Sequence, residues 1–408
     1  MITYAYQARS ADGKTVKGFA DAINEDNAIN TLMARGLMVL SLEEQATRRA
    51  GHKNPKVSTS DLVLFTRQLA TMVDAGLPLL TSLTALYEQC DSPKQAGLRF
   101  IVSEIMARVQ EGETFNEAVS KHPKIFSRLY ISMVRAGETG GMLAEILDRL
   151  AGFLEASARL VKKVKSAMTY PIVVICIALS ITTFLVVKVV PAFGSIFADF
   201  GAKLPAPTQF LIDLSAFIRG NWIWIVALIG GSVYGIRRFL ATRAGTEFWD
   251  RYKLHLPIVG PLTHKICMSR FSRTFAQLIR AGVPILEVME IVGETSGNTM
   301  VEKAIKGVSG DVEKGETLAN AMTHQPIFPP VMLRMVSAGE STGKIDVMLE
   351  KMADFWDEEI EAMLDALTSL IEPFLIVFLG VMVGGIVIAM FLPLFKLNDI
   401  VGGVSTGK

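Results

Sequence analysis

The sequence predicts a mainly α-helical, multi-pass membrane protein. We expect two repeated cytoplasmic bundles of six antiparallel helices, three transmembrane helices and a small N-terminal α+β domain. Three observations lead to this fold class. Three long stretches lack charged residues, one unit of the chain occurs twice, and residues 1–45 have a different periodicity from the remainder.

The uncharged stretches are long enough to cross a lipid bilayer. They run from Ser166 to Val187, from Gly220 to Ile236 and from Pro373 to Phe395. A hydrocarbon core ~30 Å thick needs roughly 20 helical residues. The second stretch is shorter, so we expect the arginines at its ends to extend their side chains to the interface. A buried helix of a soluble core is the alternative for each stretch.

Flanking charge predicts the orientation of these spans. Four basic residues precede the first span and three follow the second, whereas the loop between them has only Lys203 and Arg219. Cytoplasmic flanks are enriched in Lys and Arg, so both bundles and the N-terminus are predicted to be cytoplasmic and the loop periplasmic. The beginning of the sequence lacks the apolar core of a signal peptide, which agrees with this orientation.

One unit of the chain occurs twice. AGETGGMLAEILDRLAGF begins at Ala136 and AGESTGKIDVMLEKMADF begins at Ala338, 202 positions later. Pro171 and Pro373, at the entrances of the first and third spans, keep the same offset. Earlier, FTRQLATMVDAGLPLL matches FSRTFAQLIRAGVPIL 206 positions later. A register held over so long a stretch indicates two copies of one structural unit.

Each copy predicts a helical bundle. Apolar residues after Ser58 recur at helical spacing, and Thr114 and Glu117 have the spacing of a capping box. Gly140 and Gly141 interrupt the chain before a long helix that continues into the first span. Short connections predict antiparallel neighbours, with about six helices in each copy.

Residues 1–45 predict a separate small domain. Thr3–Asp21 alternates around a turn at Asp12, which indicates a hairpin; Asn24–Gly36 predicts a helix, and Leu37–Glu43 a returning strand. The expected division of the chain is 1–45 (α+β domain), 46–59 (linker), 60–168 (bundle, copy 1), 166–190 (transmembrane helix 1), 191–219 (periplasmic loop), 220–236 (transmembrane helix 2), 237–370 (bundle, copy 2), 371–395 (transmembrane helix 3) and 396–408 (periplasmic tail).

Composition argues against several functional classes. The net charge of +1 gives no signal for nucleic acid. Cys90, Cys176 and Cys267 are too scattered for a zinc site or a disulfide framework. The sequence shows no Ser–His–Asp or Cys–His set and no paired acids suited to hydrolysis. We therefore expect no catalytic, metal-binding or cofactor-binding residues, and we predict that the protein is not an enzyme.

A glycine-rich segment in copy 2 resembles a phosphate-binding loop. In Gly339–Ile345, however, the first glycine is replaced by Ala338, and Ile345 stands where Ser or Thr would hold Mg²⁺. The segment also joins two predicted helices, whereas a phosphate-binding loop follows a strand. A turn between helices is the better interpretation.

Four residues of this repeated turn are candidates for a structural or partner-binding role: Gly137, Glu138, Gly339 and Glu340. Each glutamate precedes a predicted helix start, where free N–H groups and the helix dipole favour a carboxylate. A cation site or a partner contact is the alternative for both glutamates.

The membrane helices carry a second group of candidate residues. We expect entry and packing roles for Pro171, Pro373, Glu372, Gly231, Gly235, Gly380 and Gly384. The four glycines form small-xxx-small patterns, which allow close approach of helix backbones. Glu372 is interpreted as an interfacial acid, with a functional acid facing the bundle interior as the alternative.

The helices that enter the first and third spans have opposite charge. Residues 153–170 contain four basic residues and one acid, whereas residues 355–372 contain six acids and no basic residue. The repeat aligns Arg159 with Glu361 and Lys163 with Asp365. We hypothesise that these helices face each other, within one subunit or between subunits. The alternative is two solvated faces, with lipid headgroups attracting the basic one.

Several long motifs, in order, resemble a known family. FTRQLATMVDAGLPLL, MVRAGETGGML, KVKSAMTYPIVV and VVPAFGSIFADFGAKLPAPTQFLI are similar to the inner-membrane F-protein family of type II secretion systems. The resemblance covers almost the whole chain, and the AGLP and LPAPT segments resemble most the type IV pilus assembly platform branch.

The resemblance implies a non-enzymatic assembly platform in the bacterial inner membrane. It implies a homo-oligomer whose bundles and N-terminal domain engage a hexameric secretion or pilus ATPase. It further implies contact with pilins or pseudopilins, with other inner-membrane platform proteins and with membrane lipids, but not with nucleic acid.

Other functions remain open at this point. Within the family, a type II secretion platform for protein export is the alternative to pilus assembly. A repeat-built transporter is the alternative from another class. Against a transporter, three spans are too few to enclose a path and none has an ionisable residue near its middle.

Overall fold

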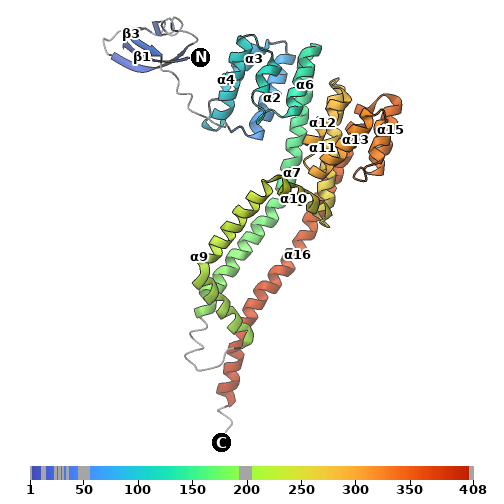
Figure 1. Cartoon of the computed structure of the whole chain (residues 1–408). Helices are drawn as coiled ribbons and strands as arrows, with labels where there is room; N and C mark the ends of the chain where they lie inside the picture. Colours follow the sequence, from blue (N-terminus) through green and yellow to red (C-terminus); the bar gives the residue numbers. More distant parts are fainter. Residues whose placement is uncertain are drawn as a thin grey trace. The chain divides into compact units, whose positions relative to one another are not determined.

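The structure is a computed structural model, shown in Figure 1, which describes residues 2–10, 15–22, 25, 29, 32–33, 36–44, 56–192 and 205–403. The chain divides into two compact units, residues 1–154 and residues 155–408.

The N-terminal segment contains an antiparallel sheet of order β2-β1-β3 in its described residues. The strands are β1 (Ile2–Ser10), β2 (Thr15–Ala22) and β3 (Leu37–Glu44). The predicted hairpin and returning strand are therefore confirmed. The predicted hairpin turn lies outside the described residues. The predicted helix over 24–36 is described at only four helical positions, namely Glu25, Ile29, Leu32 and Met33.

The first bundle begins after a capped start, because the Ser58 hydroxyl accepts the Asp61 N–H. Residues 56–192 hold six α-helices: α2 (Thr59–Asp74), α3 (Leu79–Gln89), α4 (Ala96–Gln110), α5 (Phe115–Ser120), α6 (Arg128–Gly140) and α7 (Leu143–Phe184). A short 3-10 turn, η1 (Pro93–Gln95), precedes α4. The predicted capping box of Thr114 and Glu117 is present at α5.

The second bundle repeats this order of helices. It contains α11 (Val259–Arg280), α12 (Ile285–Thr295), α13 (Thr299–Glu313), α14 (Leu318–Thr323), α15 (Pro330–Thr342) and α16 (Ile345–Gly403). Its core includes the tilted rings of Phe271, Phe275 and Phe328. The correspondence of α11–α16 with α2–α7 confirms the predicted repeat. One further helix, α10 (Arg243–His255), precedes this bundle.

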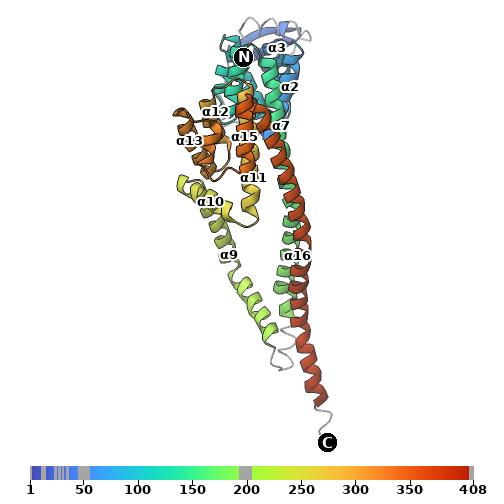
Figure 2. The same ribbon diagram turned by 90° about the vertical axis from the view of Figure 1, so that its right-hand side faces the viewer.

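Three helical stretches of the described chain are long and apolar enough to cross a membrane: Leu143–Ala192, Ala206–Leu240 and Ile345–Leu392. Figure 2 shows α9 (Ala206–Leu240) and α16 extending away from the helices of the second bundle. At most 17% of the most apolar window of each stretch is buried within the protein. So large an exposed apolar surface is stable only in lipid, which excludes the alternative of buried helices in a soluble core. The chain is a membrane protein.

Two of these stretches depart from regular, straight helices. The first ends in a π-helical turn, η2 (Leu185–Val189). The second is α9 (Ala206–Leu240), which kinks at Asn221, where φ is −118° and ψ is 18°. The kink follows Gly220, a residue type that weakens helices. The predicted span 220–236 therefore corresponds to the part of α9 that follows the kink.

The first part of α9 was predicted as loop but is helical. Of the predicted periplasmic loop 191–219, residues 191–192 and 206–219 are helical, and residues 193–204 lie outside the described residues. The periplasmic location of the segment stays a prediction. Packing explains the additional helix. Thr208 is buried and its hydroxyl donates to the carbonyl of Ala389 on α16, and Ser215 is also buried. Contacts with another helix, invisible in the sequence of this segment, stabilise it.

The same glycine turn precedes α7 and α16. Gly141 and Gly343 have φ of 68° and 69°, a left-handed conformation that favours glycine. After Gly141, the Met142 N–H donates to the Gly137 carbonyl at 2.8 Å; after Gly343, the Lys344 N–H donates to the Gly339 carbonyl at 2.8 Å. This bonding pattern ends a helix and reverses the chain.

A second glycine in each turn allows two helices to touch. A Cβ at Gly137 would lie 3.0 Å from the Cβ of Ile146, and a Cβ at Gly339 would lie 2.8 Å from the Cα of Ile345. The first obstacle is a side chain that can shift, whereas the second is backbone.

We therefore expect Gly339→Ala to destabilise the second bundle more than Gly137→Ala destabilises the first. Overpacking of this kind costs about 1–3 kcal/mol, and Gly339→Ala is expected at the upper end because backbone must move. Pulse proteolysis in urea, with fragments assigned to each bundle by mass spectrometry, measures both effects.

The matched control is Gly310→Ala in α13. A Cβ at Gly310 meets nothing within 4 Å, so alanine is expected to leave the second bundle unchanged or stabilise it by up to ~1 kcal/mol. Equal stability of the Gly339→Ala and Gly310→Ala proteins would contradict the packing role of Gly339.

Candidate functional site

The carboxylate of Glu138 joins α6 to the start of α5. Its two oxygens accept the N–H groups of Phe115 and Asn116, at 2.6 Å and 2.8 Å. These are the first two residues of α5, whose N–H groups have no partner within the helix. One half-buried side chain thus satisfies two backbone donors and places its negative charge at the positive end of the helix dipole.

The second copy contains the same contact. Glu340 of α15 accepts the N–H groups of Leu318 and Ala319, the first residues of α14, at 2.7 Å and 3.1 Å. We call the contacts of Glu138 and Glu340 the carboxylate clasps. Their recurrence, at positions matched by the repeat, shows that the clasp is a feature of the repeated unit.

The structure corrects which helix the glutamates meet. The sequence placed each carboxylate near the start of the following helix, α7 or α16. The structure shows it at the start of the preceding short helix, while Gly141 or Gly343 forms the turn into the long helix. The contact involves residues that are distant in sequence, so the local spacing of the turn gave no sign of it.

Glu138→Gln and Glu340→Gln are expected to destabilise their bundles by about 1.5–3 kcal/mol each, the range for a hydrogen bond to a charged group. The amide NH₂ would face a backbone N–H, leaving one buried donor without an acceptor. Hydrogen exchange at the first two amides of α5 or α14 should accelerate in the variant copy only. Glu111→Gln, at an exposed position, is the control; exchange unchanged by Glu138→Gln would contradict the clasp.

Charged residues join α11 to α16 over several turns. The Arg280 guanidinium bonds Asp346 and Glu350, at 3.0 Å and 2.5 Å. Nearer the membrane, Arg273 bonds Asp354 and Asp357, and Lys265 bonds Glu359. The hydrogen bond that Arg280 donates to the Glu350 carboxylate is the main reason why the pKa of Arg280 is raised. A network of this kind fixes the direction of α16 relative to the second bundle better than isolated pairs would.

An ion pair also joins the equivalent helices of the first copy. Arg67 of α2 bonds Asp148 of α7 at 2.5 Å. Under the repeat, the position of Asp354 is occupied by Gly152, where a Cβ would lie 3.8 Å from the Arg67 guanidinium. The two copies share their backbone plan but differ at this position, which is acidic only in the second copy.

The oppositely charged juxtamembrane helices meet within the chain at one pair. Lys163 of α7 forms an ion pair with Glu361 of α16. The repeat offset placed Arg159 against Glu361, but Arg159 lies 4.0 Å from Glu155 of its own helix. Asp365 lines the same open cleft between α7 and α16 as Lys163. The residues in contact are therefore not the ones that the repeat aligns. The repeat compares equivalent positions in the two copies, whereas an ion pair needs two side chains at the same level of neighbouring helices.

Further toward the membrane core, α7 and α16 remain neighbours. The Thr182 hydroxyl lies 3.4 Å from the sulfur of Met382. An apolar cavity lies between the two helices, lined by Val174, Ile177, Ala178, Ile181, Leu379 and Val383. The pair therefore continues from charged to apolar contacts as it enters the lipid.

The other candidates in the spans do not pack helices together within the described chain. A Cβ at Gly231, Gly235, Gly380 or Gly384 would meet nothing within 4 Å in the described residues, so no second helix approaches these glycines there. Their packing role stays a prediction. Pro171 is buried within α7, and Pro373 and Glu372 are exposed on α16. Glu372 thus fits an interfacial acid better than one facing the interior.

Carbodiimide crosslinking, which joins an amine to a carboxylate in direct contact, tests the juxtamembrane pair. We expect a crosslink between Lys163 and Glu361, its loss in Lys163→Glu, and its return in the Lys163→Glu, Glu361→Lys double variant. Lys162→Glu, one residue away and exposed, should retain it. The exposed pair stabilises by about 1 kcal/mol or less, so the fold should survive these changes. Absence of the crosslink in the unaltered protein would contradict the pairing.

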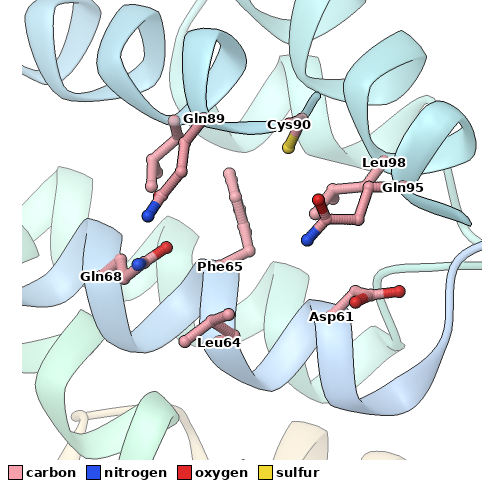
Figure 3. Close-up of a pocket in the computed structure, with 9 residues that line it drawn as sticks. Asp61, Leu64, Phe65, Gln68, Gln89, Cys90, Gln95 and Leu98 are labelled. Carbon is pink, nitrogen blue, oxygen red and sulfur yellow. The ribbon is translucent and has the colours of Figure 1, made fainter. Parts of the chain in front are cut away.

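Figure 3 shows a small cavity in the first bundle, between α2, α3 and α4, lined by Asp61, Leu64, Phe65, Gln68, Leu86, Gln89, Cys90, Gln95 and Leu98. Its volume, about 70 Å³, suits a few waters and is far below that of a typical ligand pocket. Burial raises the pKa of the Cys90 thiol, the opposite of an activated nucleophile. This cavity does not fit a nucleotide or a catalytic cysteine.

Metal ligands are also not gathered in the part of the chain that the structure describes. It holds no group of three or more His, Cys, Asp or Glu side chains placed to bind an ion. The features that do recur are the clasps, the glycine turns and the passage of a bundle helix into the membrane. They define a class of protein, a repeat-built membrane scaffold of helical bundles.

Comparison with known proteins identifies the family. The family described as type II secretion system (T2SS), protein F, matches residues 65–191 and 271–393, and that described as type II secretion system protein F, N-terminal domain, matches residues 1–43. The chain belongs to the type II secretion system protein F family. Both repeat matches begin at the core phenylalanine of α2 or α11 and end close to the end of the membrane stretch of that copy.

Relatives at high coverage include proteins of both branches. The type IV pilus assembly protein PilC of Thermus thermophilus is 41% identical, covering 97% of this chain and 98% of the relative. PilC of Myxococcus xanthus is 38% identical, covering 97% and 94%. The type II secretion system protein F of Vibrio cholerae is 32% identical, covering 98% and 99%. The likeness to the pilus branch is therefore confirmed.

Proposed function

We propose that this protein is a non-enzymatic inner-membrane platform that couples a hexameric cytoplasmic ATPase to the polymerisation of pilins. One observation carries the proposal: α16 is a single helix from the second bundle through the third membrane span. Movement of that bundle would be transmitted to lipid depth without chemistry in this chain. The family and the pilus assembly proteins among its relatives support this function.

The charged contacts of α16 suit such a transmitting element. Arg280, Arg273 and Lys265 hold successive turns of α16 against α11. Below them, Lys163 links α16 to the helix of the first span. A torque applied to the second bundle would therefore reach both helices of this pair together. The energy would come from the partner ATPase.

Flanking charge supports the orientation that this function needs. The basic residues before the first span and after the second favour the cytoplasmic side for both bundles. The N-terminal sheet and the bundles would then face the ATPase, and the spans would face pilins and other platform proteins. A homo-oligomer would place several copies of the α7–α16 pair around a growing filament.

A proline in α16 tests the coupling. Leu370 is 71% exposed, so Leu370→Pro removes little packing but interrupts the helix, at about 3 kcal/mol. We expect normal membrane insertion, normal copurification with the ATPase and a loss of surface pili of about tenfold or more, since a kink would dissipate the movement. Leu370→Ala, the matched control, should assemble pili normally. Full piliation with Leu370→Pro would contradict the coupling role.

Deleting the gene separates pilus assembly from the alternative of protein export. The alternative is supported by the relatives that are named type II secretion system protein F. Loss of surface pili with normal levels of secreted enzymes supports the pilus function, and the reverse result supports export. Loss of neither would contradict the proposed function.

A further inference from the structure

Helix α10 lies outside the three membrane spans and exposes aromatic side chains on one face. Phe248, Trp249 and Tyr252 are 63%, 44% and 53% exposed, and the rings of Phe248 and Tyr252 stack with centroids 6.2 Å apart. The helix lies between the two family matches, so it belongs to neither copy of the repeat. A group of large, exposed aromatic side chains on one helix face is typical of a surface that binds a membrane or another protein.

The opposite face of α10 is fixed to the second bundle. Asp250 is buried and its carboxylate accepts the Thr299 N–H at 2.8 Å, at the start of α13. Asn298 donates to the Asp250 carbonyl, and Lys253 pairs with the carboxylate at 2.7 Å. Desolvation opposes ionisation of Asp250, but the bonds from Lys253 and Thr299 prevail and lower its pKa. These contacts determine which side of α10 is left free.

The start of α10 is fixed to the end of the second span. Only two residues separate Leu240 of α9 from Arg243 of α10, and Thr242 caps the new helix. A Cβ at Gly245 would lie 2.0 Å from the Phe239 carbonyl oxygen, so only glycine allows this approach. Figure 2 shows α10 at the end of α9, where the chain changes direction. The aromatic face therefore begins where the polypeptide leaves the lipid.

The charges near this face are mainly positive. Arg237 and Arg238 end α9, and Arg243 and Arg251 are exposed on α10. Glu247, an exposed acid of α10, is paired with Lys303 at 2.9 Å. Tyr and Trp beside arginines, immediately after a membrane span, match the composition of the headgroup region, where aromatic rings and basic side chains both gain free energy.

We propose that α10 is an interfacial helix that lies on the membrane, with its aromatic face among the headgroups of anionic phospholipids. The bilayer is favoured over a protein partner because the face continues directly from a membrane span and is framed by arginines. Through Asp250 and Thr299, α10 would hold the second bundle at a fixed height on the membrane surface. This role differs from the coupling proposed above and does not depend on it.

Tryptophan fluorescence in the full chain tests the proposal. The protein has four tryptophans, Trp222, Trp224, Trp249 and Trp356, so replacing three of them by Phe leaves one reporter at a time. Each single-tryptophan protein is reconstituted into bilayers of phosphatidylcholine and phosphatidylglycerol that contain a lipid with a nitroxide on its headgroup. Trp224 in α9 is the lipid-exposed control, and Trp356, 6% exposed in the second bundle, is the buried control.

We expect the headgroup nitroxide to reduce Trp249 emission by about twofold or more, and to leave Trp356 emission nearly unchanged. A nitroxide near the end of the acyl chain should quench Trp249 less than the headgroup nitroxide does. Quenching of Trp249 as weak as that of Trp356 would overturn the proposal. It would indicate that a second copy or another protein covers the face.

Two further measurements guard against variants that fail to fold. In the unaltered protein, phosphatidylglycerol carrying a headgroup photocrosslinker should label residues 243–255. Absence of label there, with label present on α9, would overturn the proposal.

The second measurement adds Arg243→Gln and Arg251→Gln to the protein whose single tryptophan is Trp249. These changes should weaken quenching in bilayers with phosphatidylglycerol more than in phosphatidylcholine alone. Equal quenching in both bilayers would contradict selection of anionic lipid.

Discussion

The carboxylate clasp is the contact on which each repeated unit depends. Helices α5 and α14 have six residues each, too few to be stable without outside partners. Glu138 and Glu340 satisfy their first N–H groups and anchor them to α6 and α15. The glycine one residue earlier allows the long helix to pack against the same turn. A short helix, a turn and a membrane-entering helix are thus organised around one side chain and its glycine neighbour.

The two copies have diverged in what they attach to this shared plan. The second copy places acidic residues along α16 that pair with Arg273 and Arg280 of α11. At the position of Asp354, one of these acids, the first copy has Gly152. Arg273 and Arg280 each bond two carboxylates, and a network of this kind holds helix geometry better than an isolated exposed pair does. The second bundle is thus joined to α16 by ion pairs and to α10 through Asp250, and these are the contacts that the proposed transmitting and anchoring roles use.

Much of the fold was accessible from the sequence because its signals are local. Uncharged stretches of sufficient length predicted the spans, and the 202-residue offset from Ala136 to Ala338 predicted two equivalent bundles. Opposite charge predicted that the juxtamembrane helices meet, though the observed partner of Lys163 is Glu361, which the offset had assigned to Arg159. Aligning the two copies by their offset finds residues in equivalent positions of the repeat. Which residues touch depends instead on how the two helices pack against each other.

By itself, the sequence determined the membrane helices, the repeat and the glycine turns, since hydropathy, periodicity and left-handed glycine conformations act within a few residues. Only the tertiary structure decided where the carboxylates of Glu138 and Glu340 bind, why residues 206–219 are helical, and which face of α10 is free. Each of these depends on a partner far along the chain. A carboxylate can reach the free N–H groups of a short helix, and Asp250 can become buried, only once two distant helices have packed together.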